Sequence, residues 1–288
     1  MRILLIIFIL FHSRLLSAVI YGEDDRLDYY QMSDFAQKLT ESSVAFIPKK
    51  RLIKRGKRYY IVPQILQNLA DFCENENFIE QTTLANCSGV LIEKDKVLTA
   101  AHCVEQNSWG FSQEEYYVVF GHRLTRKGQK RKFFTENEVF ELRQEEFYFF
   151  DETLSETAID LAIYKLDRPT GRPALRVSRK KPNIGDKVFV IGYPLGIPVK
   201  YSGLSAVSGV DDSPNSFRYH LDTFSVNSGS PIFLSTGELI GIHVRGTGFN
   251  YQQGHNQCYE WGKGSIGTDF GEANYLRILG EIESLVSN

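Results

Sequence analysis

Short runs of residues that either alternate between hydrophobic and polar or are wholly apolar follow one another along most of this chain. The first is the apolar run 44–47, and a denser series begins at Cys87. Runs of these two kinds, separated by turn residues such as Ser235, Thr236 and Gly237, predict β-strands. We expect two sets of strands: residues 89–92, 97–99, 116–120, 133–140 and 161–165, and then residues 187–191, 204–210, 219–221, 232–234 and 239–244.

Many short strands at this spacing favour antiparallel barrels over a parallel sheet. The polar stretch 167–183 contains three prolines, separates the two sets and is typical of a linker between two lobes. We therefore expect an all-β fold, with a first barrel over about residues 40–166 and a second over about 184–270. Five aliphatic residues with helical spacing predict a C-terminal helix within residues 271–288: Leu276, Ile278, Leu279, Ile282 and Leu285.

Two segments before Cys87 have patterns of their own. Residues 48–58 include seven Lys and Arg, which is consistent with a polyanion-binding or processing site, or with a solvated loop. No aromatic residue is interleaved before Tyr59, and this favours the solvated loop. Further on, Pro63 precedes apolar residues at helical spacing, which predicts a short amphipathic helix over residues 63–72.

Composition and charge narrow the function classes. The chain has 288 residues, 42% of them hydrophobic and 13% aromatic, which is enough for one large folded domain or two small ones. Lys and Arg number 33 against 35 Asp and Glu, for a net charge of -2. This balance argues against general nucleic-acid binding.

The N-terminus has the three parts of a secretory signal peptide. Arg2 precedes the apolar run 3–11, and Leu16, Ser17 and Ala18 follow as a small-residue cleavage site. A membrane anchor is the alternative, but this run is far shorter than the ~20 residues that span a bilayer. We expect residues 1–18 to be removed, giving a mature protein that begins at Val19 and is secreted, either outside the cell or into a periplasm. In that oxidising compartment the four cysteines could form two disulfides.

Three residues have the chemistry of acyl transfer. Ser228 lies in the sequence Asn-Ser-Gly-Ser-Pro, where a tight turn would expose its hydroxyl. A neutral imidazole such as His102 can take the hydroxyl proton, and a carboxylate such as Asp160 can fix the tautomer of that imidazole. Each has an ordinary alternative: a surface turn for Ser228, a packed core histidine for His102 and a strand-edge turn residue for Asp160.

The surroundings of these residues weaken the ordinary alternatives. Cys87 and Cys103 lie 16 positions apart, and a bridge between them would tie the loop of His102 to a barrel. The motifs Cys-Ser-Gly from residue 87, Thr-Ala-Ala-His-Cys from 99, Asp-Leu-Ala from 160 and Asn-Ser-Gly-Ser-Pro from 227 occur in that order. In this respect the chain resembles the chymotrypsin-fold serine peptidases over roughly residues 87–245. The resemblance implies a peptidase domain over residues 19–270, with two perpendicular six-stranded barrels and the triad His102, Asp160 and Ser228 in the cleft between them.

Within that fold the chain is similar to the bacterial glutamyl endopeptidases. The similarity lies in the start of the mature chain at residues 19–26, in Asp-Thr-Phe at 222–224 and in Gly-Ile-His at 241–243. It implies that Thr223 and His243 bind an acidic substrate side chain, since a hydroxyl and an imidazolium can both donate to a carboxylate. His243 could equally be a neutral histidine on a buried strand.

The pocket has a second interpretation. Asp222 lies six residues before Ser228, where trypsin-like enzymes place the aspartate that binds Lys or Arg. Asp-Thr-Phe also occurs at this point in some glutamyl endopeptidases, so the position alone leaves both preferences open. Arg245 could neutralise Asp222 or could itself attract acidic substrates.

Two residues near Ser228 depart from the pattern of trypsin-like enzymes. Asn227 replaces the aspartate that pairs with a newly cut N-terminus in animal trypsins, and a neutral amide cannot form that ion pair. In the glutamyl group the mature N-terminal amine reaches the specificity pocket, and here that residue would be Val19. Val226 stands where the family has glycine and where a backbone N–H forms the oxyanion hole with that of Ser228. A β-branched residue resists the positive φ that many active conformations need there.

We therefore expect a secreted serine endopeptidase that acts on a peptide or protein substrate through an acyl-enzyme, with the backbone N–H groups of Val226 and Ser228 as the oxyanion hole. The alternative is a catalytically weak or inactive pseudo-peptidase that binds peptides or a partner protein, as Val226 indicates. No metal or other cofactor is implied, because the six histidines and four cysteines show no ligand spacing apart from the bridging pair. We expect no nucleic-acid partner and no stable membrane association after signal cleavage. Cys73 and Cys258 could form the second disulfide.

Overall fold

Six antiparallel strands from the first half of the chain close into a barrel. The structure is a computed structural model that describes residues 19–104, 115–151, 159–210, 215–254, 257–277 and 279. In hydrogen-bonded order the strands are β10 (Asp160–Leu166), β6 (Lys96–Thr99), β5 (Cys87–Glu93), β2 (Ser43–Pro48), β7 (Tyr116–Phe120) and β9 (Val139–Phe150). Pairing of β9 with β10 completes the circle.

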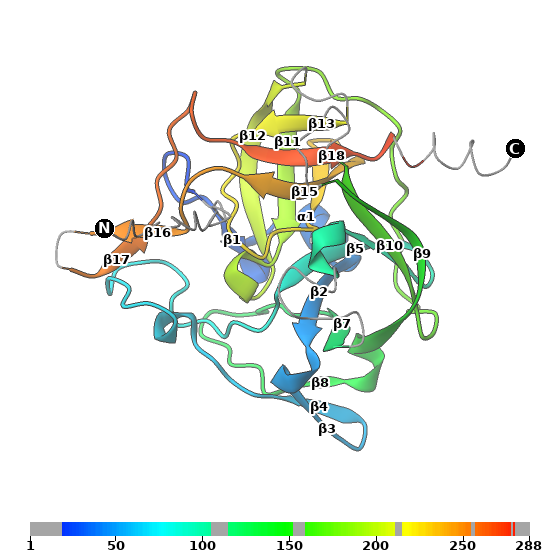
Figure 1. The fold of residues 1–288 in the computed structure, drawn as a ribbon. Helices are drawn as coiled ribbons and strands as arrows, with labels where there is room; N and C mark the ends of the chain where they lie inside the picture. The colour runs from blue at the N-terminus through cyan, green and yellow to red at the C-terminus, as the bar shows by residue number, and fades with distance from the viewer. Residues whose placement is uncertain are drawn as a thin grey trace, which may run out of the picture.

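The second half forms another closed six-stranded barrel. Its strands, again in hydrogen-bonded order, are β12 (Lys200–Gly209), β11 (Lys187–Gly192), β14 (Pro231–Leu234), β15 (Leu239–Gly246), β18 (Gly271–Tyr275) and β13 (Ser216–Tyr219). Pairing of β12 with β13 closes this barrel, and the short strand β1 (Leu27–Asp28) adds to the outside of β12. In Figure 1 the strands of this barrel, yellow-green to red, lie above those of the first. The predicted fold of two six-stranded antiparallel barrels is confirmed.

Three expected elements differ from the observed ones. The expected strand 133–140 is interrupted by the 3-10 turn η6 (Glu136–Glu138), because the side chains of Thr135 and Glu138 form a capping box. The basic segment 48–58 belongs to a hairpin instead of a loop: strand β3 (Leu52–Arg55) pairs with β4 (Arg58–Ile61), and β4 pairs in turn with β8 (Phe133–Thr135). The amphipathic segment 63–72 contains only the one-turn 3-10 helix η3 (Leu66–Asn68).

The predicted C-terminal helix is wrong over residues 271–275. Gly271–Tyr275 is strand β18, which lies between β15 and β13 in the second barrel, and the barrel needs it for closure. Tertiary pairing thus decides these five residues, whereas the aliphatic residues with helical spacing begin only at Leu276, after the strand, and Arg277 and Leu279 are helical. The remainder of the predicted helix, residue 278 and residues 280–288, lies outside the described residues, as does the predicted signal peptide 1–18.

The remaining elements are short. They are the helix α1 (Asp34–Thr40), the 3-10 turns η1 (Tyr29–Gln31), η2 (Lys49–Arg51), η4 (Ala101–Cys103) and η7 (Pro194–Gly196), and the hairpin of β16 (Tyr251–Gln253) and β17 (Tyr259–Trp261). Residues 167–186, between β10 and β11, contain no helix or strand. No helix in the described part of the chain is both long and apolar enough to cross a membrane.

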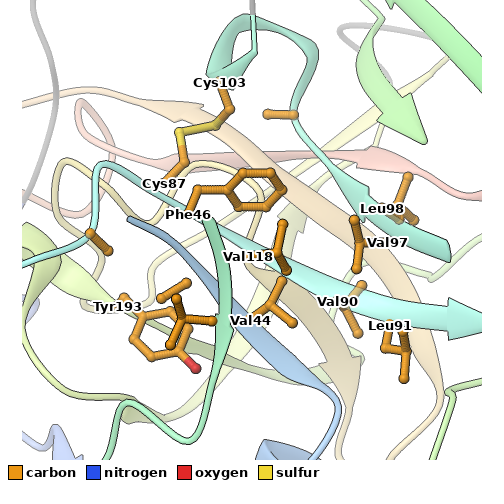
Figure 2. Close-up of a cluster of buried hydrophobic side chains, with 14 of the residues drawn as sticks. Val44, Phe46, Cys87, Val90, Leu91, Val97, Leu98, Cys103, Val118 and Tyr193 are labelled. Carbon is orange, nitrogen blue, oxygen red and sulfur yellow. A yellow bond between two sulfur atoms is a disulfide. The ribbon is translucent and has the colours of Figure 1, made fainter. Parts of the chain in front are cut away.

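The core runs from the interior of the first barrel toward the second. Buried side chains of β2, β5, β6 and β7 belong to one hydrophobic cluster, and Figure 2 shows Val44, Val90, Leu98 and Val118 among them. Tyr193, which follows β11 of the second barrel, belongs to the same buried cluster. The disulfide between Cys87 and Cys103 lies at one end of this cluster, beside Phe46 (Figure 2). The two barrels therefore share packing at their junction, and the predicted site residues lie there.

Candidate active site

His102 lies in η4, which directly follows β6 of the first barrel. Its neighbour Cys103 is bonded to Cys87 at the start of β5, so the turn is covalently tied to the barrel. Both predicted disulfides are present, because Cys73 is also bonded to Cys258. The sulfurs of Cys87 and Cys103 lie within 4.8 Å of a His102 nitrogen, but in a disulfide they cannot act as thiolate metal ligands. With 18% of its side chain exposed, His102 is accessible to solvent.

The Asp160 carboxylate accepts two hydrogen bonds from His102. The backbone N–H of His102 donates to Oδ1 at 2.9 Å, and Nδ1 of the imidazole lies 2.5 Å from Oδ2. The N–H of Asp160 in turn donates to Oδ1 of the buried Asn274 on β18, at 2.8 Å. Because a carboxylate accepts and does not donate, Nδ1 carries the ring proton and Nε2 presents its lone pair. The second barrel thus positions an acid that orients the histidine of the first barrel.

Ser228 lies in the loop before β14, and Ser88 of β5 holds this loop from the first barrel. The N–H of Ser88 donates to the Ser228 carbonyl at 2.8 Å, and the Ser88 hydroxyl donates to the Val226 carbonyl at 2.9 Å. The adjacent Gly229 has a φ of 85°, and a Cβ there would lie 2.0 Å from the Ser88 carbonyl oxygen. Only glycine fits this close approach. The Sγ of Cys103 is 3.6 Å from the Ser228 carbonyl oxygen, so η4 and the serine loop are neighbours.

Val226 adopts the positive φ that the sequence analysis expects it to resist. Its φ is 76°, in the left-handed region that is costly for a β-branched residue. The residue occupies the third position of a turn closed by the Asn227 N–H, which donates to the Phe224 carbonyl at 2.9 Å. On the other side, the Leu195 N–H donates to the Ser225 carbonyl at 2.7 Å. Surrounding hydrogen bonds therefore fix both peptide groups that flank Val226.

The peptide groups around Ser228 leave two donors available. The Ser225–Val226 peptide is trans, so the Val226 N–H points away from the carbonyl that Leu195 holds. Among the described residues, neither this N–H nor that of Ser228 has a hydrogen-bond acceptor. Two unpartnered N–H groups beside a serine hydroxyl can stabilise a developing oxyanion.

Thr223 borders the N-terminal segment that begins at Val19. The Val19 N–H donates to the Thr223 carbonyl at 3.0 Å, and the Ile20 N–H donates to the Gly262 carbonyl at 2.8 Å. The Val19 side chain is buried between Gly248 and Gly264, where an added Cβ would lie 2.3 Å and 2.7 Å from it. The expected mature N-terminus therefore lies beside the residues that the sequence analysis assigns to substrate binding.

His243 is buried on β15 and hydrogen bonds to the serine loop. Its carbonyl accepts from the Gly229 N–H at 2.8 Å, and its N–H donates to the Ser230 carbonyl at 2.9 Å. The hydroxyl of Tyr219 lies 2.5 Å from Nδ1 of the ring. Burial, with a smaller contribution from His102, lowers the pKa of His243 to about 3. Of the two interpretations of His243, the structure therefore favours the neutral imidazole over the imidazolium.

Asp222 faces the N-terminal segment. Its Oδ1 accepts from the Tyr21 N–H at 2.8 Å, and its Oδ2 is buried with no partner among the described residues. Burial raises the pKa of Asp222 to about 7, despite the hydrogen bond from Tyr21. A carboxyl that is about half protonated at pH 7 is a weaker counter-ion for a Lys or Arg side chain than an ordinary aspartate.

Two further sequence hypotheses have structural outcomes. Arg245 donates to the carboxylate of Glu272 at 2.6 Å, so its charge is paired on the neighbouring strand and does not neutralise Asp222. The Asn227 side chain accepts from the Ser230 hydroxyl at 3.2 Å, while the Val19 N–H lies at Thr223 instead. The trypsin-like pairing of this position with the N-terminus is therefore absent between these described residues.

Sequence reasoning misses three residues that support the site. Tyr219 contacts His243, Asn274 holds the backbone of Asp160, and Asn250 accepts from the Ser225 N–H at 3.0 Å. Asn274 falls in a segment expected to be helical, so no pattern pairs it with β10. Tyr219 is one of several buried strand residues, and nothing in the sequence indicates that it contacts His243.

Comparisons with known proteins agree with this geometry. The sequence profile of the trypsin-like peptidase domain matches residues 87–242. Exfoliative toxin A of Staphylococcus aureus is 30% identical over 174 residues, which are 58% of this chain and 58% of the toxin. A glutamyl endopeptidase of Staphylococcus epidermidis is 34% identical over 80 residues, 28% of each protein. The chain thus spans less than two thirds of the length of either curated relative.

A solved structure gives the same fold. The structure of a Glu endopeptidase in complex with MPD matches with a TM-score of 0.53 over 94% of this chain and 100% of the other. The identity between the two is 17%, so the match concerns the fold alone.

Proposed function

The chain belongs to the family of trypsin-like peptidase domains, and we propose that it is a secreted serine endopeptidase that cleaves on the carboxyl side of Glu or Asp. The observation that carries this proposal is the hydrogen bond between Nδ1 of His102 and Oδ2 of Asp160, beside a serine loop with two unpartnered N–H groups. An oriented base, a hydroxyl and an oxyanion site are the parts that acyl transfer requires.

The reaction proceeds in two halves. Ser228 Oγ attacks the carbonyl carbon of the scissile peptide while its proton passes to Nε2 of His102. The N–H groups of Val226 and Ser228 hold the oxyanion, and Asp160 stabilises the imidazolium. His102 then gives the proton to the leaving nitrogen as the C–N bond breaks, which leaves an acyl-enzyme. A water molecule deprotonated by His102 hydrolyses this ester and restores the Ser228 hydroxyl.

Thr223 and His243 support a preference for acidic side chains. With the Tyr219 hydroxyl donating to Nδ1, His243 keeps its proton on Nε2 and can donate to a carboxylate as a neutral ring. The similarity to a glutamyl endopeptidase of S. epidermidis points the same way. The high pKa of Asp222 and its position against Tyr21 argue against a preference for Lys or Arg.

Export and processing complete the proposal. Removal of residues 1–18 would turn the Val19 nitrogen, which lies 3.0 Å from the Thr223 carbonyl oxygen, into an ammonium group. That positive charge next to Thr223 would favour an acidic substrate side chain. The inactive alternative depends on the reluctance of Val226 to adopt positive φ, and its φ of 76° removes this support.

A peptide library tests the proposal. The protein is expressed with export and incubated with a mixed library, and the cleaved bonds are identified by mass spectrometry. We expect cuts after Glu and Asp that are absent with Ser228→Ala. Cuts after Lys or Arg would favour the Asp222 interpretation, and an identical product pattern for Ser228→Ala would refute the peptidase proposal.

A further inference from the structure

The sheet of β3, β4 and β8 gathers cations from two distant segments. Residues 49–58 contain seven Lys and Arg and residues 123–132 contain six, and neither segment contains Asp or Glu. Pairing of β4 with β8 brings the segments together, and the Ile61 N–H donates to the Lys132 carbonyl at 3.0 Å. In Figure 1 this sheet lies at the bottom of the view, beyond β2 and β7 of the first barrel. The charge is therefore concentrated on one part of a protein whose net charge is -2.

The two faces of the sheet differ in exposure. Leu52, Tyr59 and Phe134 are buried against the first barrel. On the opposite face Ile53, Tyr60 and Phe133 lie side by side across the three strands, and Arg55 is opposite Arg58 in the next row. We call these five residues the basic sheet face. Ile53, which lies in the row with Tyr60 and Phe133, is 48% exposed.

The arginines of the basic sheet face rest on its aromatic rings. The guanidinium of Arg58 lies 4.5 Å from the centre of the Phe133 ring, and that of Arg55 lies 5.8 Å from the centre of the Tyr60 ring. In the described part of the chain neither arginine forms an ion pair with a carboxylate. Cation–π contacts orient these groups but leave their charge unneutralised. The aromatic residues that the basic segment lacks in sequence are thus supplied by the topology.

Some nearby charges are neutralised. Lys57 pairs with Glu136 at 3.4 Å, Arg131 pairs with Glu138, and Arg123 pairs with Glu41. Other cations along the 123–132 segment are exposed: Arg126, Lys127, Lys130 and Lys132. The basic sheet face therefore lies next to a further set of exposed positive charges.

We propose that the basic sheet face binds an acidic segment of another polypeptide. Arg55 and Arg58 would hold its carboxylates, and the exposed row that includes Ile53 would take its apolar side chains. Strand β3 pairs only with β4 among the described strands, so its outer edge can also bond a peptide backbone.

Other polyanions fit this surface less well. The faces of Tyr60 and Phe133 already hold guanidinium groups, so they are not free to stack on nucleic-acid bases. A sulfated polysaccharide would use the cations but has no apolar side chain for Ile53. The proposal concerns a surface apart from the serine loop and does not depend on the proposed peptidase activity.

Fluorescence anisotropy of a labelled peptide tests the proposal. The whole chain carries Ser228→Ala, so that no probe is cleaved. The probe has three Glu or Asp residues for each Phe or Leu, and a matched probe has Gln and Asn in place of the acids. We expect the acidic probe to bind at least about tenfold more tightly, with an affinity that falls as salt is raised.

Surface variants locate the binding. The double variant Arg55→Glu with Arg58→Glu is expected to weaken binding of the acidic probe at least about tenfold. Ile53→Ser is expected to weaken it about threefold. The control, Lys165→Glu with Lys187→Glu, makes the same charge change at exposed positions on β10 and β11 and should stay within about twofold. Circular dichroism checks folding, and Arg55→Gln with Arg58→Gln replaces the charge reversal if that variant does not fold.

Three results would overturn the proposal. The first is equal binding of the acidic and amide probes. The second is an unchanged affinity when the two arginines are reversed or neutralised. The third is a pair of findings: heparin or a single-stranded oligonucleotide displaces the probe at a tenth of the probe's concentration of negative charge, and Ile53→Ser has no effect. The surface would then recognise charge alone.

Discussion

The hydroxyl of Tyr219 and Nδ1 of His243 lie 2.5 Å apart in the interior of the second barrel. Burial raises the pKa of Tyr219 well above its ordinary value, so the phenol stays protonated, and Nδ1 of His243 is the only hydrogen-bond partner of its O–H in the described part of the chain. Nδ1 is then the acceptor, and the imidazole proton is fixed on Nε2. His243 is thereby prepared to donate a hydrogen bond without becoming charged.

Tyr219→Phe should weaken recognition of acidic substrates. Loss of the donor frees His243 to place its proton on Nδ1, where it no longer serves the pocket. A buried hydrogen bond contributes about 1 kcal/mol, so we expect kcat/KM for a Glu substrate to fall by about five- to tenfold, mainly through KM. Steady-state kinetics with paired Glu and Gln substrates measures this, and the Gln substrate should change little.

Tyr193→Phe is the matched control. Tyr193 is also buried, and its hydroxyl donates to the Ser43 carbonyl at 3.2 Å, away from His243. This variant should lose similar stability but keep the ratio of Glu to Gln cleavage. An equal loss of that ratio in both variants would mean that Tyr219 has a structural role only.

In the Asp222→Asn background, the preference for Glu over Gln should not change between pH 5.5 and pH 7.0, below the range in which an α-amino group such as that of Val19 loses its proton. A pKa of about 3 keeps His243 neutral throughout this range, and a substrate carboxylate stays ionised. We expect a flat profile when the ratio of kcat/KM values is plotted against pH. A drop in the ratio centred near pH 6.5 would instead mean that His243 binds the substrate as an imidazolium.

Asp222→Asn should change the pH dependence of stability. The pKa of Asp222 rises from its ordinary value of 3.8 to about 7 in the folded protein. The folded state therefore binds more protons than the unfolded state between these values, and stability falls as pH rises through this window. The loss is on the order of a few kcal/mol. The amide of the variant does not titrate. We therefore expect the difference in Tm, variant minus wild type, to be about 5 °C larger at pH 8 than at pH 4.

Differential scanning calorimetry of both proteins at the two pH values checks this expectation. The comparison cancels the other titrating groups, which the two proteins share. A constant difference in Tm between wild type and Asp222→Asn would contradict the raised pKa.

Val226→Gly tests whether the valine impairs the oxyanion site. Glycine adopts a φ of 76° without strain and supplies the same N–H. Because neighbouring hydrogen bonds already hold this backbone in place, we expect kcat to stay within about threefold of wild type. An increase of tenfold or more would show that Val226 keeps the N–H out of position.

The strands of the two barrels could be predicted from sequence because they are short alternating or wholly apolar runs bounded by turn residues, and their arrangement followed from the resemblance carried by four ordered motifs. The basic hairpin could not, since Arg58 and Tyr60 owe their strand to pairing with β8, more than 70 residues away in sequence. Residues 271–275 differ from their prediction for the same reason: β18 is a strand because β13 and β15 need a neighbour between them.

In the site, too, the sequence motifs could be predicted but the surroundings of the side chains could not. His102, Asp160 and Ser228 each lie in a motif that can be recognised locally, and the structure brings the first two into hydrogen-bond contact. The environment of each group is non-local. His243 hydrogen bonds to Tyr219 and Asp222 hydrogen bonds to Tyr21, and no spacing rule connects the members of either pair.

Reaction with a fluorophosphonate probe shows whether Ser228 is an activated nucleophile. Such a probe bonds covalently to a serine only where a base and an oxyanion site activate the hydroxyl. We predict stoichiometric labelling of the exported protein, with the modified peptide containing Ser228, and no labelling of Ser228→Ala or His102→Ala. Failure of the folded protein to react, or equal labelling of Ser228→Ala, would contradict the assignment of Ser228 as the nucleophile.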